Sequence, residues 1–441
     1  MTRPKNALFL VLMAVFASGG ILFSGISSYD FIVHLDRQVH AITCSFIPGA
    51  GSLDTTGTSG CYAALMSPYS SIMRTTVWGG IPIALMSMSV FAYLLFRALD
   101  VLLGKKRSDP HESLFLVAAS FLPVFMSVIY FLIAVYLVGA VCKLCMGIYI
   151  ASAGVFVFAI LSCWKAFRAQ KGGEEQAAGA AKTSVPWSRF AVYFAEGLVF
   201  VAVPVLLYLA LKPAYTEEMS RCGDLAHGED KYGVRVRLAG SASGVPAVEV
   251  LDPLCPACKG FKERLEASGL VERLDLQGVL FPLDKQCNWM VSESLHPGAC
   301  AVSEAVLCAG DRAPDVLTWS LEHNEELREL GALDAKAPPT KKGPPEYARV
   351  YARVLQEFPS LGDCVNKPAV RSRINKSLRW IVSNSLPVLT PQLYVGGRKL
   401  CDEDTDLGLE FSLSRLLETR MSMALPGATA GIPAGPAGGR P

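Results

Sequence analysis

Five long apolar stretches constrain the fold of this chain more than any other feature of its sequence. A helix needs about 20 apolar residues to cross the hydrocarbon core of a bilayer. Four of the stretches contain no charged residue and the fifth contains only Glu196; they cover residues 7–29, 75–96, 113–141, 144–164 and 190–211. The sequence therefore predicts an α-helical membrane bundle with a fifth span.

The first stretch could instead be a cleaved signal peptide. Such a peptide has an apolar region of about 7–15 residues that is followed by a cleavage site with small residues. Residues 7–29 are longer than that, and Ala17-Ser18-Gly19 is only a weak candidate for cleavage. We therefore expect the first helix to be an uncleaved membrane span.

The composition supports a membrane protein and divides the chain into two halves. Of the 441 residues, 51% are hydrophobic and only 18% are charged, which is too apolar for an ordinary soluble protein. The apolar residues concentrate in the first half, whereas the chain from about residue 215 has the mixed charge of a soluble domain. The net charge of +2 gives no reason to expect nucleic acid as a partner.

The positions of lysine and arginine predict the orientation in the membrane. They cluster before the first stretch, between the second and third, and between the fourth and fifth: Arg3, Lys5, Lys105, Lys106, Arg107, Lys165, Arg168, Lys171, Lys182 and Arg189. Loops rich in these residues face the cytoplasm. The segments that carry all cysteines except Cys163 then share the opposite, oxidising side. We interpret Cys163 as an inert thiol, and we assign no function to Glu196 near the cytoplasmic interface.

Cys142-Lys143-Leu144-Cys145 stands at the beginning of the fourth stretch. Two thiols at this spacing can close a disulfide, and a thiolate at a helix N-terminus is stabilised by the helix dipole. The alternative is a zinc site of four cysteines completed by Cys44 and Cys61. Redox chemistry is favoured because a membrane bundle already folds by helix packing and gains little from a structural metal.

These cysteines belong to a wider pattern that resembles the vitamin K epoxide reductase family of the bacterial type. The pattern covers about residues 7–165 and contains, in order, Cys44, Cys61, Ser67, Gly80-Ile81-Pro82, Cys142, Cys145 and Tyr149. In that family a four-helix bundle surrounds a quinone. The resemblance implies that this half passes electrons from thiols to the membrane quinone pool, either ubiquinone or menaquinone.

The resemblance also implies a role for each matched residue. Cys145 would be the thiol that faces the quinone, and Cys142 would exchange with a loop cysteine, for which Cys61 is the first candidate. Cys44 would pair with Cys61 and receive electrons from outside. Ser67 and Tyr149 would line the quinone pocket. Tyr149 lies one turn after Cys145, on the same helix face, although an aromatic at the membrane interface would also suit this position.

A second C-x-x-C pair lies in the mixed-charge half. A strand pattern, the pair, a helical pattern and a second strand pattern follow one another at residues 247–251, 255–258, 259–268 and 274–283. This order is typical of the thioredoxin-like fold. Pro256 suits the first helical turn, so we expect Cys255 to be the exposed nucleophile and Cys258 the buried resolving thiol. A zinc knuckle would need a second ligand pair at regular spacing.

The end of the chain resembles the remainder of a thioredoxin-like domain. Thr390-Pro391 precedes a short strand pattern and a Gly396-Gly397 turn. The resemblance implies that the bond before Pro391 is cis and that this loop faces the active cysteine. Residues 299–385 are mainly helical, and a helical insertion at this place resembles thioredoxin-like oxidases of the DsbA type.

Six cysteines of this half lie outside its C-x-x-C pair. Cys287 and Cys300 bracket a short segment with Trp, Pro and Gly, and we expect them to form a structural disulfide. The sequence does not distinguish among the pairings of the others. These are Cys222, Cys308, Cys364 and Cys401.

The patterns together predict five parts. They are a vitamin K epoxide reductase-like membrane domain at 1–170, a cytoplasmic linker at 171–188, a fifth transmembrane helix at 189–212, a thioredoxin-like α/β domain at 213–425 and a flexible tail at 426–441. We expect a multi-pass protein of the bacterial inner (cell) membrane, with the thioredoxin-like domain in the periplasm or outside.

Three functions compete on this evidence. The first is an enzyme that forms disulfides in exported proteins, with the thioredoxin-like domain as the oxidant and the membrane domain reoxidising it with quinone. The second is a relay that carries electrons outward to reduce disulfides. The third is a membrane scaffold held by metal. The two C-x-x-C pairs and the two loop cysteines favour redox chemistry, and the quinone-type bundle favours oxidation.

Overall fold

The computed structural model describes residues 7–36, 41–45, 53–54, 59–104, 109–174, 187–213, 215, 222–337 and 347–424. The chain divides into two compact units, Met1–Ala214 and Tyr215–Pro441. The predicted tail and residues 175–186 of the predicted linker lie outside the described residues.

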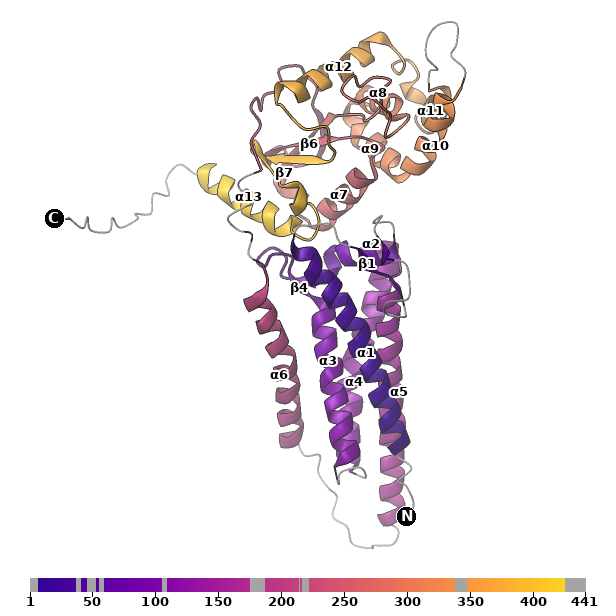
Figure 1. Cartoon of the computed structure of the whole chain (residues 1–441), viewed down its shortest axis with the longest axis vertical. Helices are drawn as coiled ribbons and strands as arrows, with labels where there is room; N and C mark the ends of the chain where they lie inside the picture. The colour runs from indigo at the N-terminus through magenta and orange to yellow at the C-terminus, as the bar shows by residue number, and fades with distance from the viewer. Residues whose placement is uncertain are drawn as a thin grey trace, which may run out of the picture. The chain divides into compact units, whose positions relative to one another are not determined.

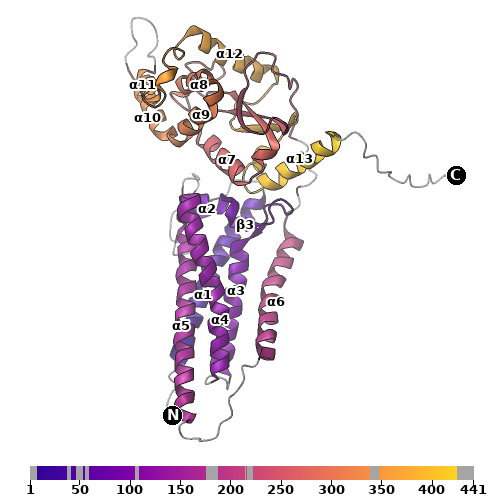
Figure 2. The ribbon, with the colours of Figure 1, turned by 180° about the vertical axis from the view of Figure 1, so that it is seen from behind.

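Among the described residues of the first unit, five helices are long and apolar enough to cross a membrane. They are α1 (Ala7–Val33), α3 (Ile83–Leu103), α4 (Pro110–Ile133) continued by η3 (Ala134–Val138), α5 (Lys143–Glu174) and α6 (Trp187–Leu211). Helix α1 packs against α3 and α5, α4 packs against α5, and α6 packs against α3 from outside this group of four (Figures 1 and 2). The predicted helical bundle with a fifth helix is therefore confirmed.

Two helix bounds differ from the sequence prediction. Helix α3 begins at Ile83 rather than near residue 75, because Gly79 and Gly80 take φ values of 65° and 79° and so interrupt the helix. Helix α5 continues past residue 164 to Glu174, into the predicted linker.

Short elements fill the chain between α1 and α3. They are η1 (His34–Asp36), β1 (Ile42–Thr43), β2 (Leu53–Asp54), α2 (Gly60–Met66), η2 (Pro68–Ser70), β3 (Ser71–Ile72) and β4 (Ile81–Pro82). Strand β1 pairs with β2 and β3 pairs with β4, both antiparallel. Cys44 directly follows β1, and Cys61 lies in the first turn of α2.

The second unit is built on a five-stranded sheet of order β5-β7-β6-β8-β9. The strands are β5 (Val236–Gly240), β6 (Val245–Leu251), β7 (Leu274–Leu280), β8 (Gln392–Val395) and β9 (Arg398–Lys399). Strands β6 and β7 run parallel, as the crossover through α7 (Pro256–Ala267) and η5 (Val271–Arg273) requires, and the other pairs are antiparallel. A central strand that leads into a C-x-x-C helix confirms the predicted thioredoxin-like α/β domain.

A group of helices separates β7 from β8, as the sequence predicted (Figure 1). They are α8 (Ala299–Cys308), η6 (Gly310–Arg312), α9 (Ala313–Glu322), α10 (Asn324–Ala335), α11 (Ala348–Glu357), η7 (Pro359–Leu361) and α12 (Pro368–Ser383). After β9, η8 (Asp402–Asp404) and α13 (Leu409–Ala424) complete the unit. One apolar core joins Leu251, Leu254 and both cysteines of the C-x-x-C pair to the inserted helices. The insertion therefore covers the side of the sheet from which the active pair emerges.

Three disulfides hold the second unit together. The structure joins Cys287 to Cys300, the pair expected from the sequence. The other two bridges are Cys222–Cys401 and Cys308–Cys364. They close segments of 179 and 56 residues, and long closed loops restrict the unfolded chain the most.

Candidate active sites

In the first unit, the four helices of the bundle and α2 line a cavity of about 510 Å³. Its walls include Cys61, Cys142 and Cys145. Ser67 and Tyr149 also line it. The structure thus brings five of the residues singled out in the sequence around one apolar space.

Four of the five cysteines of this unit form a disulfide and a free thiol pair. Cys44 and Cys61 are bonded, with 5.7 Å between their Cα atoms. Cys142 and Cys145 are free thiols. The backbone N–H of Cys145 donates to Sγ of Cys142 at 3.4 Å. Because Cys142 immediately precedes α5, its sulfur lies at the end of the helix where the dipole favours negative charge.

Gly60 allows α2 to pack directly on the chain before Cys142. A Cβ atom on Gly60 would lie 2.6 Å from the backbone oxygen of Val141, where real Cβ atoms do not approach. Ser59 caps α2, because its hydroxyl accepts a hydrogen bond from the N–H of Tyr62 at 3.2 Å. The missing side chain and the cap together hold the start of α2, and with it Cys61, against the Cys142 segment.

Asp30, near the end of α1, belongs to this site and was missed from the sequence. It lines the cavity and is 5% exposed. Its carboxylate accepts hydrogen bonds from the N–H of Thr43 at 3.0 Å and from the Thr43 hydroxyl at 3.3 Å. Thr43 precedes Cys44, so Asp30 fixes the strand that carries the disulfide. The available signal was a charge at the end of an apolar stretch, which is costly unless it has a role.

The two hydroxyl residues are held by their surroundings. Ser67 ends α2; its hydroxyl donates to the carbonyl of Ala64 at 2.8 Å, and its own carbonyl accepts from the buried Arg74 at 2.9 Å. Tyr149 packs edge-on against Phe131, with 6.1 Å between the ring centroids. Both side chains therefore have fixed positions in the cavity wall.

Helix α6 also contributes to the cavity wall, through Leu198 and Val201. Near its end, the hydroxyl of Tyr208 donates to the carbonyl of Gly80 at 2.6 Å. This contact connects the fifth helix to the Gly-Ile-Pro segment before α3. This contact could not be predicted, because an apolar helix face that packs on protein has the same sequence pattern as one that faces lipid.

The other end of α6 is held by a buried ionic cluster. Arg97 of α3 and Glu112 of α4 form an ion pair at 2.7 Å, and both are less than 5% exposed. The hydroxyl of Tyr193 donates to Glu112 at 2.5 Å, and its ring lies 3.7 Å from the Arg97 guanidinium. Glu196 lies 3.8 Å from Arg97. Glu196 is thus part of the contact that fastens α6 to the bundle.

In the second unit, the C-x-x-C pair stands at the start of α7. Cys255 is the N-cap residue and Pro256 occupies the first turn. Both cysteines are free thiols. The expectation that Cys255 is exposed is wrong: it is 5% exposed, because it belongs to the apolar core that the inserted helices share. Its Sγ lies 3.7 Å from the carbonyl oxygen of Thr390, next to the cis Thr390–Pro391 bond.

The pKa values of the two thiols of this pair are shifted in opposite directions. The hydrogen bond from the Cys258 thiol lowers the pKa of Cys255 to about 6, with further help from Thr390, the backbone N–H of Cys258 and the charge of His296. Burial raises the pKa of Cys258 well above its ordinary value, and the neighbouring sulfur and the charge of Glu249 act in the same direction. Burial also raises the pKa of Glu249 to about 8. Cys255 is therefore the thiol of the pair that ionises more readily.

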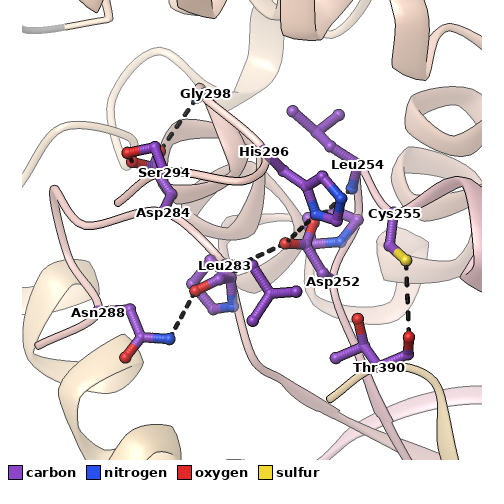
Figure 3. A network of polar contacts seen from close by, with 12 residues as sticks. Asp252, Leu254, Cys255, Leu283, Asp284, Asn288, Ser294, His296, Gly298 and Thr390 are labelled. Atoms are coloured by element: carbon purple, nitrogen blue, oxygen red, sulfur yellow. Dashed lines mark hydrogen bonds and ion pairs between the residues drawn. The ribbon is translucent and has the colours of Figure 1, made fainter. Parts of the chain in front are cut away.

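Asp252 and His296 adjoin this pair and were also missed from the sequence (Figure 3). Nδ1 of His296 lies 2.9 Å from the carboxylate of Asp252, which is fully buried. Asp252 begins the turn that contains Cys255, and the N–H of Cys255 donates to its backbone carbonyl at 3.1 Å. His296 comes from the loop before α8, so only the fold brings it to the motif.

Among the described residues, one group has the spacing of metal ligands: Cys222, Cys401 and Glu403. Its two cysteines form one of the structural disulfides. A zinc site of Cys44, Cys61, Cys142 and Cys145 would need all four cysteines as thiolates. Cys44 and Cys61 are instead joined in a disulfide.

Comparison with known proteins identifies the first unit. Residues 11–160 match the model of the vitamin K epoxide reductase family, so the predicted resemblance is confirmed. The match includes the Cys44–Cys61 disulfide and the Cys142–Cys145 pair, and it ends before α6. A comparison with curated proteins returns no match.

Two solved structures are similar to part of the chain. One is the oxidoreductase DsbA from Xylella fastidiosa, with 21% identity, a TM-score of 0.29, and coverage of 42% of this chain and 92% of that one. The other is reduced DsbA1 from Neisseria meningitidis, with 15% identity, a TM-score of 0.27, and coverage of 45% and 97%.

Proposed function

We propose that this chain is a quinone-dependent thiol oxidoreductase that forms disulfide bonds in exported proteins. In this proposal its vitamin K epoxide reductase domain at residues 11–160 reoxidises its thioredoxin-like domain. One observation carries the proposal: Cys61 of the Cys44–Cys61 disulfide, a free C-x-x-C pair and two fixed hydroxyl residues share the wall of one apolar cavity within a membrane-type bundle. Few functions other than exchange between thiols and a lipid-soluble redox partner need that combination.

The cavity fits a quinone head group. Its volume of about 510 Å³ lies within the usual range of small-molecule sites, which is about 300–1,000 Å³. Its walls are mostly apolar, and Tyr149 offers a hydroxyl that can donate to a carbonyl oxygen, while the hydroxyl of Ser67 in the same wall already donates to the carbonyl of Ala64. A bound quinone, whether ubiquinone or menaquinone, would accept the two electrons and two protons that a dithiol releases. In this proposal Cys145 faces it and Asp30 keeps the Cys44 strand in place.

The proposed reaction runs by thiol–disulfide exchange. A substrate dithiol reduces the Cys255–Cys258 disulfide and leaves with a disulfide of its own. Cys255 then attacks the Cys44–Cys61 disulfide, and the reduced loop pair in turn reduces a Cys142–Cys145 disulfide. Each exchange moves one electron pair inward, and the protons leave the thiols as each disulfide closes.

The acidity of Cys255 supports the oxidising direction. A low thiol pKa stabilises the reduced form of a C-x-x-C pair, and this makes its disulfide a stronger oxidant. The distribution of lysine and arginine supports an orientation with both C-x-x-C pairs outside the cytoplasm, and we place the protein in the bacterial inner membrane. Exported protein thiols are the substrates that this location provides.

The test uses the purified full chain in lipid nanodiscs under anaerobic conditions, with a reduced peptide dithiol and a soluble quinone. We expect one quinone to be reduced for each peptide disulfide formed. Cys145→Ser should abolish quinone reduction, while Cys163→Ser, which changes the free thiol outside both pairs, should leave it unchanged. Peptide oxidation without quinone reduction in the unmodified chain would refute the proposal.

A further inference from the structure

We propose that His296, held by Asp252, is the positive charge that stabilises the Cys255 thiolate when it leaves during disulfide transfer. This inference rests on the proposed function and adds a residue from a distant loop to its active site. The two residues between the cysteines are Pro256 and Ala257. Neither can carry a charge, so any side-chain cation at this pair must come from elsewhere in the fold.

The contacts of Asp252 hold the imidazole of His296 in one orientation. Its carboxylate is fully buried and accepts hydrogen bonds from the N–H of Leu254 at 2.7 Å and of Leu283 at 2.6 Å. Its remaining partner is Nδ1 of His296 at 2.9 Å. A buried carboxylate is stable when it is satisfied by donors and faces a positive group. Nδ1 therefore carries the hydrogen, and Nε2 is the nitrogen that is left to face another group.

The loop that carries His296 is itself fixed. The N–H groups of Leu295 and His296 both donate to the carbonyl of Leu283, at 2.9 and 3.1 Å. Four residues after His296, Cys300 closes the disulfide with Cys287. The side chain of His296 is only 12% exposed. The imidazole thus sits on a cross-linked loop at the active pair, and its charge is little screened by water.

His296 and Cys255 affect each other's charge. The charge of His296 helps to lower the pKa of Cys255, and the thiolate helps to raise the pKa of His296. Burial and the charge of Arg328 on α10 oppose protonation of His296, but Asp252 and Cys255 outweigh them and raise its pKa above the ordinary value of 6.5. Figure 3 shows the ring at Asp252 with Cys255 as its neighbour. The two groups therefore favour each other's charged forms.

The charge of His296 acts at the end of disulfide transfer, when Cys255 leaves the mixed disulfide. One substrate thiolate attacks Sγ of Cys255, the Cys255–Cys258 bond breaks, and Cys258 leaves and takes up a proton. A second substrate thiolate then attacks the substrate sulfur of the mixed disulfide, the new substrate disulfide forms, and Cys255 leaves as a thiolate. The imidazolium of His296, held by Asp252 at the start of the same turn, interacts with that leaving sulfur and stabilises the charge that develops on it.

The test measures the acidity of Cys255 in the reduced full chain. The rate of alkylation by iodoacetamide is followed from pH 4 to 9, and the peptide that contains Cys255 is quantified by mass spectrometry. In His296→Gln we expect the acid dissociation constant of Cys255 to fall roughly tenfold, since one nearby opposite charge shifts a pKa by about 1 or more. His227→Gln, at an exposed histidine of the same unit, is the matched control and should not change it.

A second variant separates the charge from the packing of the ring. Asp252→Asn keeps the shape but removes the charge that favours the imidazolium, so Cys255 should again become less acidic, and its equilibrium with glutathione should move toward the disulfide. An alkylation profile of Cys255 in His296→Gln within about twofold of the unmodified protein, with the Cys287–Cys300 bridge intact, would overturn the inference. Both readouts need neither quinone nor substrate. Failure of the proposed function would appear in the quinone assay and leave these measurements unaffected.

Discussion

The close packing of Gly60 on Val141 leads to a prediction about the transfer between Cys61 and Cys142. In Gly60→Ala the new Cβ would lie 2.6 Å from the Val141 oxygen, whereas ordinary contacts begin at 3.4 Å. The two segments must therefore separate by the difference, about 0.8 Å. Both segments are backbone, so no flexible side chain can absorb the movement.

A displacement of this size matters for disulfide exchange, because the attacking sulfur must approach along the axis of the bond it breaks. A misplacement of about 1 Å can cost roughly 100-fold in rate at a reacting centre. We therefore expect Gly60→Ala to slow electron transfer from the loop pair to the Cys142–Cys145 pair by roughly 10- to 100-fold. The affinity for quinone should change little.

The assay compares two electron donors in the same nanodisc preparation. A reduced peptide must use the whole route through Cys255 and the loop pair, whereas a small membrane-permeable dithiol can reduce the Cys142–Cys145 disulfide directly. Gly60→Ala should impair only the first. Gly19→Ala, in α1 where a Cβ meets no atom within 4 Å, is the control. Equal rates with the peptide donor in Gly60→Ala and the unmodified chain would show that this contact does not set the approach of the two pairs.

Two further predictions concern acidity and the cavity wall. The pKa of Cys255 is lowered to about 6, and its thiolate stabilises the reduced form of the pair. This stabilisation is complete above the ordinary thiol pKa of 9.0 and is lost as the pH falls through about 6. Titration against glutathione from pH 8 to 5 should therefore show the reduced pair losing on the order of 2 kcal/mol relative to glutathione, and a flat profile would contradict the assignment. Val201→Trp should raise the KM for quinone without slowing peptide-driven reduction of the Cys142–Cys145 pair; Leu206→Trp, at an exposed position of α6, is the control. An unchanged KM in Val201→Trp would remove α6 from the site.

Features that depend on short sequence distances were predictable. A charge-free stretch of sufficient length has few structures available other than a membrane helix. A C-x-x-C pair between a strand and a helix places its first cysteine at the helix N-terminus, and Cys255 and Cys142 both lie there. Cys287 and Cys300 are only 13 residues apart, so their closeness in the sequence favoured this pairing.

Features that depend on distant contacts were not predictable. Asp252 and His296 are 44 positions apart, and nothing in either local sequence indicates that a loop disulfide brings them together. The Cys222–Cys401 bridge joins the two ends of the second unit. The burial of Cys255 follows from the inserted helices, which a motif of four residues does not describe. Asp30 was visible as a charge after an apolar stretch, but its partner Thr43 was not.

The two C-x-x-C pairs share one local design although their surroundings differ. In each, the first cysteine precedes its helix and its carbonyl accepts the first helical hydrogen bond: Cys142 from Met146 at 3.0 Å, and Cys255 from Lys259 at 3.1 Å. In each, the second cysteine lies within the first turn, further along the helix. A helix N-terminus stabilises the first sulfur as a thiolate, so both pairs are expected to exchange at the first cysteine. The second cysteine then takes its character from the core around it, which is a closed apolar interior for Cys258 and the wall of a cavity for Cys145. This difference suits the proposed roles, in which one pair serves protein thiols and the other delivers electrons to a quinone held within the bundle.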